Sequence, residues 1–156
     1  MKKTLLLCIV IMTLMLGACT PIVSDDASQG DYATQNKVSV LEYSMFMNKQ
    51  ITVFTTQLTS HMSLIANEGC CYENIIPVTE ETIRVLKADL DEVIVTYPPV
   101  SYEDAKETTI TVMQTAIEHM ESYLQTMKDS KPVSEYVDIF QTDFHALTAQ
   151  ANLYYQ

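Results

Sequence analysis

The three histidines are the residues best suited to hold a metal ion, because imidazole is a common metal ligand. His61 precedes Met62, and His119 precedes Met120. Imidazole and thioether together suit copper, but adjacent residues of a helix point about 100° apart, so one ion rarely takes both. The Glu-x-x-His pattern of di-iron bundles is missing as well. The residues three positions before the histidines are Leu58, Ala116 and Thr142.

We therefore expect no metal and no cofactor. Methionines are expected in the core and histidines at its polar edge, including His145 near Asp143.

No local motif indicates a catalytic nucleophile. The chain has no Gly-x-Ser-x-Gly turn, and its three glycines form no phosphate-binding loop. Carboxylates such as Asp89, Asp91 and Glu92 fall on the outer face of a predicted helix. Acid-base catalysis needs carboxyl groups held in a cleft with shifted pKa values. The sequence therefore predicts a protein that is not an enzyme.

Cys70 and Cys71 are the unusual pair of the predicted folded part. No second cysteine cluster or well-placed histidine would complete a tetrahedral metal site with them. Outside the cytoplasm, adjacent thiols are exposed to oxidation. The pair is a candidate disulfide or redox pair. A strained disulfide between neighbours, a bond to a second molecule, two reduced thiols and, with less support, a soft-metal site all remain open.

The N-terminus has the pattern of an export signal. Lys2 and Lys3 precede an apolar run over residues 5–16, which is shorter than the roughly 20 residues of a membrane-spanning helix. The run ends in Leu16-Gly17-Ala18-Cys19. This tetrapeptide resembles the lipobox of bacterial lipoproteins.

The resemblance implies that residues 1–18 are a signal peptide, cut just before Cys19. It also implies that the Cys19 thiol carries diacylglycerol, with acyl chains such as palmitate. More than one acyl chain gives stable anchoring. We expect the mature chain on the cell membrane or the outer membrane, facing outside the cytoplasm.

The segment after the cysteine, residues 19–32, is polar and shows no apolar period. We interpret it as a flexible tether that reaches roughly 20 Å on average. Without the signal peptide, seven basic residues face twenty acidic ones, a formal charge of −13. This charge repels nucleic acids, so we expect no nucleic-acid partner, and it repels anionic lipid head groups. The folded part should then stand off such a surface.

Residues 33–156 have the apolar spacing of helices. Apolar side chains recur every three or four residues over 40–65, 79–97, 105–127 and 133–154. Thr79 is predicted to cap the second helix and Pro98-Pro99 to end it, while Ser101 to Asp104 resembles a capping box for the third. Short connections force neighbouring helices antiparallel. The prediction is an all-α, up-down-up-down four-helix bundle.

These features favour a non-catalytic lipoprotein whose bundle binds or braces an envelope or surface protein. The alternative is a ligand-binding lipoprotein that captures a cationic peptide, a metal ion or a small molecule near the membrane. An open apolar groove would favour the first hypothesis. An enclosed pocket with convergent carboxylates would favour the second.

Overall fold

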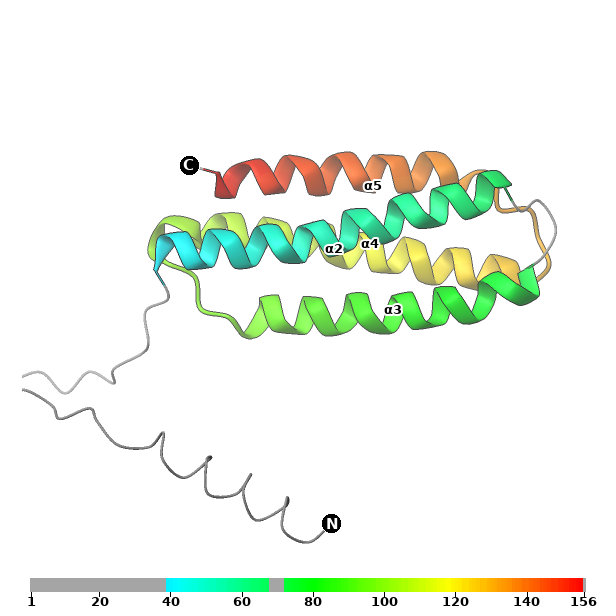
Figure 1. Ribbon diagram of the computed structural model, residues 1–156, viewed down its shortest axis with the longest axis horizontal. Coiled ribbons are helices and arrows are strands. Elements are labelled where there is room, and N and C mark those ends of the chain that lie inside the picture. Colours follow the sequence, from blue (N-terminus) through cyan, green and yellow to red (C-terminus); the bar gives the residue numbers. More distant parts are fainter. Residues whose placement is uncertain (1–38, 68–71, 156) are drawn as a thin grey trace, which may run out of the picture. The chain divides into compact units, whose positions relative to one another are not determined.

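The computed structural model describes residues 39–67 and 72–155, and these are almost entirely helical. Four long helices lie side by side (Figure 1). The elements are α2 (Val40–Asn67), α3 (Tyr72–Val95), η1 (Val100–Tyr102), α4 (Glu103–Lys128), α5 (Tyr136–Ala151) and η2 (Asn152–Tyr154). The predicted four-helix bundle is confirmed. The predicted signal peptide, the tether, Cys19, Cys70 and Cys71 lie outside the described residues.

Each helix packs against its neighbours in the sequence, and α2 also packs against α5, which closes the ring. The helices alternate in direction (Figure 1), as short connections require. At one end, here called the entry end, α2 begins, α3 passes into α4, and the chain finishes after η2. At the opposite end, α2 finishes, α3 begins, and residues 129–135 connect α4 to α5. Among the described residues, no helix is long and apolar enough to cross a bilayer.

Aromatic rings fill two levels of the core. Tyr123, Tyr136 and Phe140 pack at centroid distances of 5.3 to 5.9 Å between α4 and α5. Toward the entry end, Tyr102 packs between Tyr43 and Tyr154 at 5.8 and 5.3 Å. All six side chains are buried. The apolar spacing predicted four of them as core, and Tyr102 and Tyr136 were missed.

The beginning of α3 corrects one prediction. Thr79 does not cap this helix, because α3 begins seven residues earlier, at Tyr72, and contains Pro77 in its second turn. The proline removes one backbone donor there. The start is stabilised elsewhere: Ile75 is buried, and the Tyr72 hydroxyl donates to the carbonyl of Lys131 at 2.8 Å. The Thr79 hydroxyl lies inside the helix and donates to the Ile75 carbonyl.

Helix capping also differs from the prediction. Ser101 to Asp104 form no capping box, because the short 3-10 helix η1 precedes α4 and the N-cap residue Tyr102 makes no side-chain cap bond. A capping box occurs instead at α2. The Glu42 backbone N–H donates to Ser39 Oγ at 3.2 Å, and the Ser39 N–H donates to Glu42 Oε2 at 3.0 Å. These hydrogen bonds lower the pKa of the Glu42 carboxyl group.

Threonines are frequent inside all four helices, although their branched Cβ makes them weak helix formers. Most of their hydroxyls donate to the backbone carbonyl one turn earlier. Examples are Thr52 to Asn48 at 2.7 Å, Thr115 to Thr111 at 3.0 Å and Thr148 to Phe144 at 2.8 Å. These side chains therefore satisfy their hydrogen-bonding capacity within their own helix.

Candidate functional site

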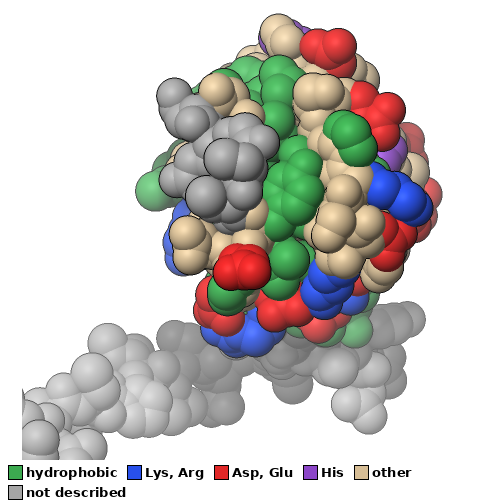
Figure 2. All heavy atoms as spheres, turned by 90° about the vertical axis from the view of Figure 1, so that its right-hand side faces the viewer, with side chains coloured by type: hydrophobic (Ala, Val, Ile, Leu, Met, Phe, Trp, Pro, Cys, Tyr) green, Lys and Arg blue, Asp and Glu red, His purple; other side chains and the backbone are tan. Residues whose placement is uncertain are grey.

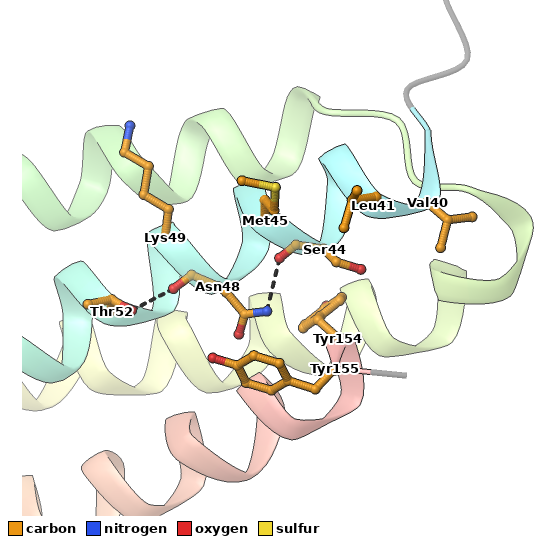
Figure 3. Close-up of a pocket in the computed structure, with 9 residues that line it drawn as sticks. All are labelled: Val40, Leu41, Ser44, Met45, Asn48, Lys49, Thr52, Tyr154 and Tyr155. Atoms are coloured by element: carbon orange, nitrogen blue, oxygen red, sulfur yellow. Dashed lines mark hydrogen bonds between the residues drawn. The ribbon is translucent and has the colours of Figure 1, made fainter.

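An open groove of about 710 Å³ lies at the entry end, between the first turns of α2 and the end of the chain. Leu41 and Met45 from α2 line it together with Tyr154 and Tyr155 (Figure 3). Leu41, Met45 and Tyr155 are exposed. These apolar side chains lie beside the buried stripe of α2 rather than on it. In the sequence, the signal for this groove was apolar residues next to the buried stripe of α2. The groove was not predicted from the sequence.

The floor of the groove is polar but largely satisfied. Asn48 Nδ2 donates to the Ser44 carbonyl at 3.0 Å (Figure 3), and Ser44 Oγ donates to the Tyr102 hydroxyl at 3.1 Å. Asn48 Oδ1 is buried and has no hydrogen-bond partner among the described residues. This acceptor has no surface accessible to solvent, so the groove offers mainly its apolar walls to a partner.

Polar contacts join α2 to α3 inside the bundle. Gln50 Nε2 donates to Glu92 Oε2 at 2.8 Å, and the Thr82 hydroxyl lies 3.3 Å from the Gln57 amide oxygen. In the same register, His61 Nε2 lies 3.2 Å from Thr79 Oγ1. These contacts fix the antiparallel pairing of the two helices, because each polar group would lose its partner in a shifted register.

The position of His61 corrects the prediction of histidines at the polar edge. His61 is 1% exposed, whereas Met62 is only half-buried. His61 Nδ1 lies 3.0 Å from the Gln57 carbonyl, and Tyr123 packs edge-on against the ring at 6.0 Å. Burial lowers the pKa of His61, and the bond to Gln57 opposes this shift only in part.

This burial predicts a loss of stability in mild acid. The unfolded chain takes up a proton at His61 near pH 6.5, whereas the folded chain does so only at lower pH. The stabilisation is therefore complete above pH 6.5 and is lost as the pH falls toward the folded value, by up to about 1.4 kcal/mol per pH unit. Urea unfolding between pH 7 and 5 should show this slope.

The matched control is His61→Gln, which keeps a polar side chain but cannot titrate. It should flatten the slope in this pH range. An unchanged slope in the variant would show that His61 is not the group responsible.

His119 on α4 and Asp143 on α5 form a second polar pair. His119 Nδ1 lies 2.9 Å from Asp143 Oδ2 and 3.1 Å from Oδ1, and the side chains are 40% and 6% exposed. His145, two residues from Asp143 in the sequence, is exposed and packs against Phe144. The second ring nitrogen of His119 has no hydrogen bond to a hydroxyl or thiol in the described residues. The pair orients an imidazole without supplying a nucleophile.

Asp143 was missed as a core residue, although its spacing placed it there. It lies three residues after Phe140 and four before Leu147, on the buried face of α5. Across residues 39–67 and 72–155, no three His, Cys, Asp or Glu side chains come together as a metal site. Of the candidate site residues from the sequence, Cys19, Cys70 and Cys71 are outside the described ranges.

No protein family model matches this chain, and neither the curated proteins nor the solved structures give a significant match.

Proposed function

We propose that this chain is a bacterial lipoprotein, held on a membrane by lipid on Cys19, whose bundle binds or braces another protein of the cell envelope without catalysis. The lipobox-like residues Leu16 to Cys19 support the anchor. The groove at the entry end is the observation that carries protein binding, since an exposed apolar groove is typical of docking sites.

The shape of the groove suits a helix or an extended segment of a partner. It runs beside α2 and is open to solvent, with Leu41, Met45 and Tyr155 available for apolar contacts. Large apolar and aromatic side chains supply most binding energy at protein interfaces. These exposed apolar side chains favour a protein partner.

The alternative, capture of a cationic peptide, a metal ion or a small molecule, has less support. None of the nine residues that line the groove is acidic. The one charged residue, Lys49, is basic, and its ammonium group points away from the groove (Figure 3). A cation would therefore find no opposite charge there.

Site-specific crosslinking tests this proposal. A photoreactive side chain at position 45 of the lipidated protein should give one discrete protein adduct in native membranes. The same group at Val78, an exposed apolar residue of α3, is the matched control and should give none. Adding Leu41→Glu should weaken binding roughly 30-fold, since losing a central apolar contact costs about 2 kcal/mol. Equal adducts from both positions, or a stoichiometric small molecule in the native protein, would contradict docking in this groove.

A further inference from the structure

The connection between α3 and α4 is strongly apolar for so acidic a chain. No charged residue occurs in the ten positions from Val93 to Tyr102. Three side chains of this connection are among the most exposed large apolar side chains of the described residues: Val95 at 71%, Tyr97 at 72% and Val100 at 84%. Contact between these apolar groups and water is unfavourable in free energy, so their burial against an apolar partner would be favourable.

Several polar backbone groups of the connection already have hydrogen-bond partners within the protein. Lys106 Nζ donates to the carbonyls of Ile94 and Thr96, both at 2.7 Å. Pro98 and Pro99 have no N–H group to satisfy. The Tyr102 N–H donates to the Pro99 carbonyl at 2.8 Å. These hydrogen bonds and the two prolines reduce the number of unpaired backbone groups in the connection. Unpaired backbone groups are costly in the hydrocarbon core, so the remaining ones restrict the connection to the interfacial layer, where water and head groups can bind them.

The connection also lies at the end of the bundle where an anchor would pull. Helix α2 begins at the entry end, so any segment that precedes it in the sequence is attached there. The α3–α4 connection lies at that same end (Figure 1). Figure 2 views the opposite end, where acidic and basic side chains lie around the apolar ones. Of the exposed large apolar side chains in the described residues, Val78 alone lies toward that end.

We propose that the connection Val95–Val100 inserts into the interfacial layer of the bilayer that carries the lipid anchor; this rests on the lipidation proposed above. Valines enter the upper acyl region, and Tyr97 places its hydroxyl among the head groups, where tyrosine is enriched in membrane proteins. The groove, lined by α2 and the chain end, is left free for a protein.

The bilayer surface for this contact is zwitterionic. Glu92 precedes the connection, and Glu103 and Asp104 follow it. These three carboxylates outnumber the one cation at the connection, Lys106, so anionic head groups would be repelled on balance. A loop with three apolar side chains binds a bilayer weakly by itself. The anchor makes its insertion an intramolecular event with a high effective concentration, and a weak contact then suffices.

Tryptophan fluorescence tests the insertion, because the chain has no tryptophan of its own. The lipidated protein with Tyr97→Trp is reconstituted in phosphatidylcholine vesicles with or without brominated acyl chains. We expect bromine to quench its emission at least twofold. Val78→Trp, the matched control at the other end, should change by less than a fifth. Adding Val100→Glu to Tyr97→Trp should abolish the quenching, and circular dichroism checks that this variant folds.

The outcomes separate the two proposals. If the protein floats with the vesicles but quenching at position 97 is no greater than at position 78, the insertion is wrong and the anchor stands. Quenching that survives Val100→Glu also overturns the insertion. If the intact mass shows no diacylglycerol on Cys19, the anchor is wrong, and the insertion falls with it. Stronger quenching in anionic vesicles would contradict the assigned lipid chemistry.

Discussion

Replacing Phe140 by alanine should lower the free energy of unfolding by about 3–5 kcal/mol, the usual cost of emptying a large aromatic site in a core. Phe140 is fully buried and packs edge-on against Tyr123 at 5.4 Å, with Tyr136 at 5.9 Å. The two neighbouring rings therefore lose a contact at once. Because small domains are stable by only about 5–15 kcal/mol, this loss is a large share of the total. Urea unfolding followed by far-UV circular dichroism measures it.

Phe144→Ala is the matched control, since Phe144 lies one turn further along α5 and is only half-buried. It should cost about 1–2 kcal/mol, because less apolar area leaves water when this side chain packs. If the two variants are equally stable, the aromatic cluster is not the centre of the core.

Replacing Cys19 by alanine should remove the protein from the membrane. Only a thiol accepts the diacylglycerol group, and two acyl chains supply nearly all of the membrane affinity of a lipoprotein. The intact mass should lack the lipid, and the product should be unprocessed or wrongly cleaved. Fractionation with and without detergent, together with mass spectrometry, measures both effects.

Cys8→Ala is the control for this experiment, because it changes a cysteine of the predicted signal peptide outside the lipobox-like residues. It should leave processing and membrane association unchanged. A Cys19→Ala protein that is cleaved normally and stays on the membrane without lipid would contradict the lipoprotein proposal.

The apolar spacing was sufficient to predict the four helices and most of the core. Residues such as Met47, Phe54, Met120 and Leu147 recur every three or four positions and are all buried. This worked because burial of an apolar stripe is the main reason why a helix packs. The order of the helices followed from short connections.

The rotation of each helix could not be predicted to within one residue. The spacing of the α2 stripe allows either His61 or Met62 to be buried. His61 is the buried one because it faces α3, where it contacts Thr79. The side-chain pairs that form between helices could not be predicted either. Asp143 has a histidine two residues away in the sequence, yet it binds His119 on α4 because the register of α4 and α5 brings them together.

The groove was missed for a related reason. Leu41 and Met45 lie outside the α2 stripe, and single exposed apolar residues are common on protein surfaces. They form a groove only because the chain end places Tyr154 and Tyr155 beside them. That neighbourhood depends on where η2 ends, which no local pattern encodes.

The threonine-rich helices have a consequence for how the chain acquires its structure. Threonine has a low intrinsic helix propensity, and a hydrogen bond from its hydroxyl to the backbone of its own helix does not raise that propensity. Helices of this kind owe most of their stability to tertiary packing. Secondary structure and assembly should therefore appear together, in one cooperative step. Until that step the chain has little lasting order, which is the condition in which a polypeptide can be threaded through a narrow channel.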